Sequence, residues 1–107
     1  MERRAIQVGG IVQGVGFRPF VYNLAARLHL TGFVKNQTGS VLIEIEGEPA
    51  SLEDFLAELR SKPPPLAQIE HLSWQPQTAQ GEHQFRIVPS DSDASNQIFI
   101  APDDRGA

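Results

Sequence analysis

The sequence predicts an α+β fold: a ferredoxin-like βαββαβ sandwich with one antiparallel sheet covered on one face by two helices, plus one extra strand. Three observations support this prediction. Stretches with helical periodicity separate stretches of alternating residues, their order is β-α-β-β-α-β followed by a further strand, and a short turn joins two neighbouring strands. Folds of this class carry many unrelated functions, so the function has to be argued from particular residues.

The strands are predicted from runs in which apolar residues share one parity. In the first run Ile6, Val8 and Val12 share a parity. The third run alternates most regularly, and the turn Thr38-Gly39 joins it to the second run as a hairpin. The expected strands cover residues 4–12, 32–37, 41–46, 68–75 and 83–88.

Two amphipathic helices are predicted. Pro19 suits the first turn of the first helix, where its missing N–H costs nothing, and apolar residues then repeat at helical spacing to about residue 29. Thr31-Gly32 is expected to end this helix, because glycine is common just past a helix C-terminus. Ser51 is expected to cap the second helix, which ends near Lys62 before three consecutive prolines.

The length of 107 residues suits one domain. We expect the folded domain over residues 1–88 and a linker or tail over residues 89–107, where the sequence is polar apart from an apolar island at residues 98–100. The absence of cysteine excludes disulfides, thiolate catalysis and cysteine-bound zinc. No apolar signal segment and no membrane-spanning run are present, so we expect a soluble cytoplasmic protein.

The formal net charge is −4, which argues against a general nucleic-acid binder. The charge is unevenly distributed, since residues 1–36 carry five basic residues and one acidic residue, whereas the remainder carries four basic and twelve acidic residues. A locally basic segment suits a small anion, and the acidic remainder would repel a long polyanion. Arginines on solvated faces explain the same distribution equally well.

The most informative stretch is residues 10–18, Gly-Ile-Val-Gln-Gly-Val-Gly-Phe-Arg, between the first strand and the first helix. Gly14 and Gly16 permit backbone φ values that other residues avoid, so successive N–H groups can turn inward as an anion-binding nest. The helix N-terminus adds unpaired N–H groups, and Arg18 adds a fork of donors. We therefore predict a phosphate cradle, the alternative being one of the many glycine-rich turns that bind nothing.

Two other phosphate-binding classes are disfavoured at this stretch. It lacks the Lys-Ser/Thr ending of a P-loop, and its glycines do not form the spaced triplet of a dinucleotide-binding site. The stretch instead resembles the acylphosphatase signature, because Gly10–Arg18 is followed at the family's spacing by Gly32-Phe33-Val34-Lys35-Asn36. This resemblance runs over residues 4–88 and implies a hydrolase of small acyl phosphates.

A narrower resemblance concerns the N-terminal domain of HypF-type carbamoyltransferases of nickel–iron hydrogenase maturation. It rests on the segments 18–25, 64–69 and 98–103. It implies a piece of a larger enzyme in which this domain hydrolyses carbamoyl phosphate and a carbamoyl-accepting maturation protein is the partner. ATP and zinc are expected only in the missing downstream domains. No cofactor is expected here.

The family resemblance also implies roles for individual residues. Arg18 and the backbone N–H groups of the loop hold the phosphoryl group, and a phosphate or sulfate ion should bind there. Asn36 orients the attacking water, and no metal is involved. The loop residues concerned are Gln13, Gly14, Val15, Gly16, Phe17 and Arg18. Taken singly, Arg18 is more often a surface or ion-pair residue, and Asn36 is more often a turn residue.

The remaining candidates are weaker. The three histidines His29, His71 and His83 have no metal spacing and are expected to be structural or exposed, while Tyr22 and Trp74 are expected to pack. Three other functions remain open: a free-standing acylphosphatase of broad specificity, a phosphate-binding domain with little activity alone, and an RNA-binding module. The acidic balance counts against the last of these.

Overall fold

The computed structural model describes residues 1–89. It contains five strands and two helices: β1 (Glu2–Ile11), α1 (Phe17–Arg27), β2 (Thr31–Gln37), β3 (Ser40–Gly47), α2 (Pro49–Ser61), β4 (Gln68–Gln77) and β5 (Phe85–Ile87). The predicted tail covers residues 89–107, of which residues 90–107, with the apolar island at residues 98–100, lie outside the described residues.

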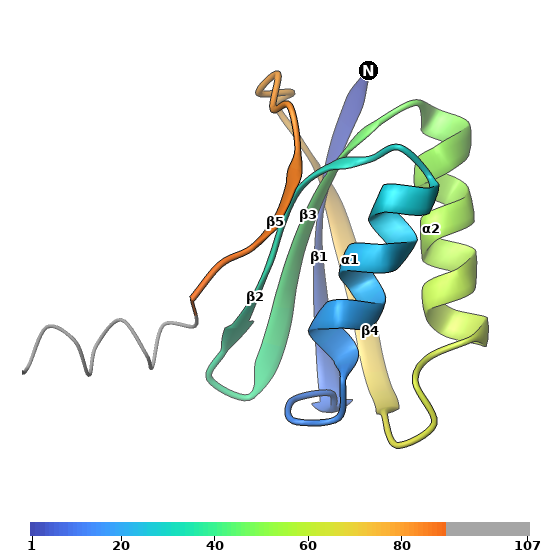
Figure 1. The fold of residues 1–107 in the computed structure, drawn as a ribbon, viewed down its shortest axis with the longest axis vertical. Coiled ribbons are helices and arrows are strands. Elements are labelled where there is room, and N and C mark those ends of the chain that lie inside the picture. The colour runs from blue at the N-terminus through green and yellow to red at the C-terminus, as the bar shows by residue number, and fades with distance from the viewer. Residues whose placement is uncertain (90–107) are drawn as a thin grey trace, which may run out of the picture.

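The strands form one sheet in the order β4-β1-β3-β2-β5, and both helices cover the same face of it (Figure 1). β1 pairs antiparallel with β3 and β4, and β2 pairs antiparallel with β3. The predicted fold class is confirmed. One detail differs, because β5 pairs parallel with β2 and makes the sheet mixed. The chain leaves β4 at one edge of the sheet and returns at the opposite edge, where β5 takes the direction of β2.

Alternation along the strands places the core between the sheet and the helices. Ile6 lies opposite Ile43 and Val8 opposite Val41, and all four side chains are fully buried. The fully buried partners supplied by the helices are Val21, Ala25, Leu52, Phe55 and Leu59. Neither helix within residues 1–89 is long and apolar enough to cross a membrane.

Two helix boundaries differ from the prediction. α1 ends at Arg27, and Thr31-Gly32 already belongs to β2. The chain turns instead at His29, whose φ of 58° is left-handed, while the Leu30 N–H donates to the Ala25 carbonyl. This bond closes the helix as a Schellman motif without glycine.

α2 also begins earlier than predicted. Its first residue is Pro49, whose fixed φ suits the first helical position, and Glu48 precedes it as the N-cap without a side-chain hydrogen bond. Ser51, the predicted cap, therefore lies inside the helix.

Candidate phosphate-binding site

The loop between β1 and α1 is bent by two glycines in the left-handed region. Gly14 has φ 75° and Gly16 has φ 78°. A Cβ atom built on either residue would meet nothing within 4 Å, so a larger side chain would fit the space. Glycine is favoured here by the left-handed backbone conformation alone. The sequence prediction of a glycine-bent loop between strand and helix is thus confirmed.

This loop presents a set of unpaired backbone donors. Within residues 1–89, no hydrogen bond is formed by the backbone N–H groups of residues 13–18. Gly16 is the N-cap of α1, where no side chain caps the helix and the first turn holds no acidic residue. Unpaired N–H groups at the positive end of a helix dipole form a favourable environment for an anion.

Arg18 follows as the second residue of α1 and is half-buried. In the part of the chain that the structure describes, its guanidinium forms no ion pair and no hydrogen bond. The other arginines of the basic N-terminal segment behave differently, because Arg3, Arg4 and Arg27 each pair with carboxylates. Much of the basic segment is therefore balanced within the fold, and the ion-pair interpretation of Arg18 is not supported.

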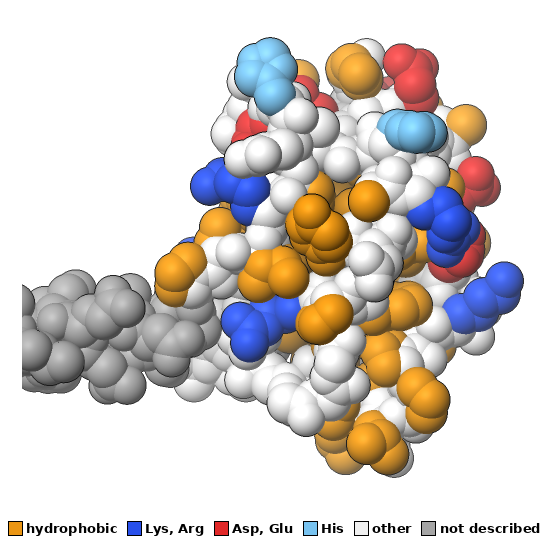
Figure 2. All heavy atoms as spheres, viewed as in Figure 1, with side chains coloured by type: hydrophobic (Ala, Val, Ile, Leu, Met, Phe, Trp, Pro, Cys, Tyr) orange, Lys and Arg blue, Asp and Glu red, His pale blue; other side chains and the backbone are white. Residues whose placement is uncertain are grey.

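The acidic side chains lie away from this loop on the face that carries the helices. In Figure 2 they gather towards the upper end and the right-hand edge, and among the described residues none is visible around the lower end. Figure 1, drawn from the same side, places the loop at that lower end. An anion approaching the loop along this face meets no visible carboxylate.

Asn36 lies in β2, opposite Val41 in β3. It shares the face of Val34, which is fully buried beneath the helices. Within residues 1–89, His29 is the only non-glycine residue with a positive φ. Asn36 therefore does not have the left-handed conformation of a turn residue. The hairpin turn follows at Thr38-Gly39, and the interpretation of Asn36 as a turn residue is wrong.

The side-chain oxygen of Asn36 is buried and, among the described residues, has no hydrogen-bond partner. A buried acceptor without a partner is uncommon, because burying it unpaired costs about 1–3 kcal/mol. The atom is closed off from solvent in this conformation, so a water molecule can bond to it only after the carboxamide turns.

The fold brings the loop, the N-terminus of α1 and the end of β2 to one end of the molecule (Figure 1). The Gln13 side chain makes the connection directly: its Nε2 donates to the carbonyl oxygens of Gln37 at 2.6 Å and Ser40 at 2.8 Å. Sequence reasoning assigned only the backbone of Gln13 to the site and missed this side chain. No local pattern could reveal it, since the hairpin lies 24 residues away along the chain.

The other candidates have structural surroundings. Tyr22 meets Phe85 edge-on at 6.2 Å, and the Arg4 guanidinium stacks over the Trp74 ring at 4.1 Å. A Cβ atom on Gly9 would overlap the His71 ring, which explains glycine at that position of β1. Within residues 1–89, no group of three or more His, Asp or Glu side chains is arranged to hold a metal ion.

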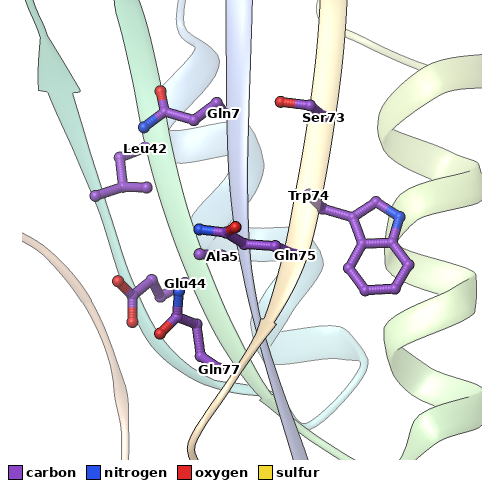
Figure 3. Close-up of a pocket in the computed structure, with 8 residues that line it drawn as sticks. All are labelled: Ala5, Gln7, Leu42, Glu44, Ser73, Trp74, Gln75 and Gln77. Carbon is purple, nitrogen blue, oxygen red and sulfur yellow. The ribbon is translucent and has the colours of Figure 1, made fainter.

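A hollow of about 430 Å³ lies away from the loop, on the sheet face that the helices leave open (Figure 3). Amide and hydroxyl side chains line it together with the Glu44 carboxylate, and no lysine or arginine does. An anion would be repelled by that carboxylate, so this hollow does not compete with the loop as a phosphate site.

The acylphosphatase family model matches residues 4–87. The chain belongs to the acylphosphatase family. The acylphosphatase of Thermotoga maritima is 42% identical over 88 residues, which cover 81% of this chain and 97% of that protein. Family membership and relatives of this name support a hydrolase.

The chain is also similar to the N-terminal region of HypF carbamoyltransferases, as the motifs predicted. The carbamoyltransferase HypF of Rhizobium leguminosarum bv. viciae is 43% identical over 90 residues, 84% of this chain and 12% of that protein. The crystal structure of full-length HypF in the phosphate- and nucleotide-bound form matches with a TM-score of 0.81 at 39% identity, over 84% of this chain and 12% of that chain. The chain thus spans only a small part of such relatives, from 9% of the probable carbamoyltransferase HypF of Methanocaldococcus jannaschii to 13% of the carbamoyltransferase HypF2 of Cupriavidus necator.

Proposed function

We propose that this domain hydrolyses carbamoyl phosphate to carbamate and phosphate, as part of a carbamoyltransferase that supplies the cyanide ligand in nickel–iron hydrogenase maturation. One observation supports the hydrolytic part of this proposal. The same segment carries unbonded N–H groups at residues 13–18 and an arginine, Arg18, that has no carboxylate partner among the described residues. The similarity to proteins named carbamoyltransferase supports the choice of substrate. ATP and zinc chemistry, and the carbamoyl-accepting partner, belong in this proposal to the rest of such an enzyme.

In the proposed reaction, a water oxygen attacks phosphorus and the bond between phosphorus and the carbamoyl oxygen breaks. Carbamate leaves with the bonding electrons, and the proton lost by the water ends on the products. The loop N–H groups and Arg18 stabilise the negative charge on the phosphoryl oxygens. An acyl phosphate has a good leaving group, so positioning and charge stabilisation are sufficient for the reaction.

Asn36 is proposed to orient the attacking water. Its buried side-chain oxygen has no protein partner within residues 1–89 and, once the carboxamide turns towards the loop, can accept one of the water's hydrogens. The oxygen lone pair of the water is then left to face the phosphorus atom. Asn36 lies one residue before the end of β2, next to the hairpin turn that Gln13 contacts.

The test is phosphate release from carbamoyl phosphate by wild type, Arg18→Gln and Arg27→Gln. Both arginines lie on α1, but Arg27 pairs with Glu58 in an exposed ion pair at the far end of the helix. We expect Arg18→Gln to lose about 10²–10³-fold in kcat, the loss typical of removing one preorganised donor, and Arg27→Gln to keep its rate. Equal rates in the two variants would contradict the proposal.

A free-standing acylphosphatase of broad specificity is the second candidate, favoured by the near full-length match to the Thermotoga maritima enzyme. Turnover of carbamoyl phosphate against acetyl and benzoyl phosphate separates the two candidates. A preference for the carbamoyl substrate supports the carbamoyltransferase, and equal turnover supports the broad enzyme. Phosphate binding without turnover would indicate a binding domain.

A further inference from the structure

The Gln13 side chain joins two parts of the candidate site that the backbone leaves unconnected. β1 pairs with β3 only as far as Gly9 opposite Ser40, and the following residues of β1 pair with β4. Within residues 1–89, no backbone hydrogen bond links residues 12–16 to the hairpin. The two bonds from the Gln13 amide nitrogen, at 2.6 and 2.8 Å, make that link.

The geometry of this link uses the whole donor capacity of the amide. The NH₂ group has two hydrogens, and each has one carbonyl acceptor, at Gln37 and at Ser40. Only the nitrogen end of the amide can face two carbonyl oxygens, so the orientation of the side chain is fixed by its neighbours. The two carbonyls flank the hairpin turn, and Gln37 directly follows Asn36 in β2.

We infer that Gln13 is a positioning residue that sets the distance between the phosphate cradle and the Asn36 carboxamide. This inference rests on the proposed function. The cradle binds the phosphoryl group through groups of its own, namely backbone N–H groups and Arg18. The hairpin carries the group that orients the water. A displacement of about 1 Å between the two costs up to about 10²-fold in rate, while phosphoryl binding is kept.

A second glutamine provides a matched control. Gln7 contacts the same hairpin from β1: its Nε2 donates to Gln37 Oε1 at 3.2 Å and its Oε1 accepts from Ser40 Oγ at 3.2 Å. Figure 3 shows Gln7 on the open face of the sheet, reaching from β1 across β3. Its partners are side chains and it does not touch the loop, so its removal changes the hairpin surface without releasing the cradle.

The experiment compares Gln13→Met with Gln7→Met, two changes that remove the amide and keep an unbranched side chain. The measured quantities are kcat for an acyl phosphate and the inhibition constant of inorganic phosphate. We expect Gln13→Met to lower kcat about 10- to 100-fold with the phosphate constant changed less than about threefold. Gln7→Met should keep both values. Gln13→Asn keeps the donors on a shorter stem and should have an intermediate kcat.

Three outcomes overturn the inference: an unchanged kcat in Gln13→Met, an equal fall in Gln7→Met, or a fall in kcat matched by an equal loss of phosphate affinity. The last result would assign Gln13 to the shape of the cradle itself. If a melting curve shows that Gln13→Met does not fold, Gln13→Asn is compared with wild type instead. The inference is then tested by the kcat and the phosphate inhibition constant of that variant. Failure of the proposed function is distinguishable, because wild type itself would then release no phosphate.

Discussion

Arg3 and Arg18 present the same guanidinium group in opposite circumstances. Arg3 is 1% exposed and donates to three carboxylates, Glu44 at 2.9 Å, Glu46 at 3.1 Å and Glu82 at 2.8 Å. Arg18 is half-buried beside unbonded N–H groups and has no carboxylate partner within the described residues. The first charge is therefore balanced within the fold, whereas the second has no carboxylate partner among residues 1–89, as the proposed phosphate site requires.

The pKa values at the Arg3 cluster follow from this arrangement. Burial by itself would lower the pKa of Arg3, but its hydrogen bonds to Glu44, Glu46 and Glu82 outweigh that effect and raise the pKa. The Gln80 backbone N–H is the main cause of a lowered pKa at Glu46; the Gly81 N–H and Arg3 act in the same direction, against burial. The cluster therefore fastens the loop between β4 and β5 to the sheet in its charged form.

The largest expected effect comes from replacing each of these two arginines in turn. Arg3→Met leaves several carboxylates close together without their cation, and we expect the free energy of unfolding to fall by about 3–5 kcal/mol. Arg18→Met should change it by no more than about 0.5 kcal/mol while abolishing most activity. Denaturant unfolding and phosphate release measure the two quantities. An Arg18→Met variant as unstable as Arg3→Met would refute the distinction.

A smaller effect is expected from two glycines with the same backbone conformation. Gly16 has φ 78° and Gly81 has φ 71°, and a Cβ atom on either would meet nothing within 4 Å. Gly16→Ala and Gly81→Ala should each cost about 1–2 kcal/mol of stability, because both force alanine into the left-handed region. Only Gly16→Ala should weaken phosphate binding in a titration calorimeter. Equal phosphate affinity in the two variants would exclude the loop from the site.

The smallest expected effect concerns acid. Because the pKa of Glu46 is lowered in the folded state, its contribution to stability is present above its ordinary value of 4.5 and is lost as the pH falls below it. Glu46→Gln removes the charge and replaces one of the two acceptor oxygens by an NH₂ group, so it also loses part of the hydrogen bonding from Gln80, Gly81 and Arg3. We expect this variant to be less stable than wild type at neutral pH and to approach it as the pH falls. Thermal melts from pH 7 to pH 3 measure this difference, and a constant gap would contradict the assignment.

Local features of the site could be predicted from the sequence, because neighbouring residues produce them. The glycine-bent loop, the start of α1 near Pro19 and the hairpin turn at Thr38-Gly39 all depend on conformational preferences within a few residues. The predicted end of α1 was wrong because the local rule expects glycine just past a helix, whereas His29 takes the left-handed conformation here.

Features that depend on distant pairing could not be predicted. The parallel direction of β5 follows from its place at the far edge of the sheet. Arg3 bonds to three glutamates that follow it in the chain by 41, 43 and 79 positions. The sequence of the basic N-terminal segment therefore could not show that most of its charge is balanced by distant carboxylates. The Gln13 link depends on the hairpin folding back beside the loop. The role of Asn36 stays a prediction, although its strand position and unpaired oxygen are consistent with it.

The amides of residues 13–18 and the Arg18 guanidinium are proposed to bind a phosphoryl group together. The most direct measurement is a titration of the ¹⁵N-labelled domain with inorganic phosphate, followed through its backbone amide resonances and repeated with Arg18→Gln. We expect saturable shifts concentrated at residues 13–18 in wild type, and much weaker shifts in the variant. Shifts confined to the open sheet face around Gln75, or unchanged affinity in Arg18→Gln, would contradict it.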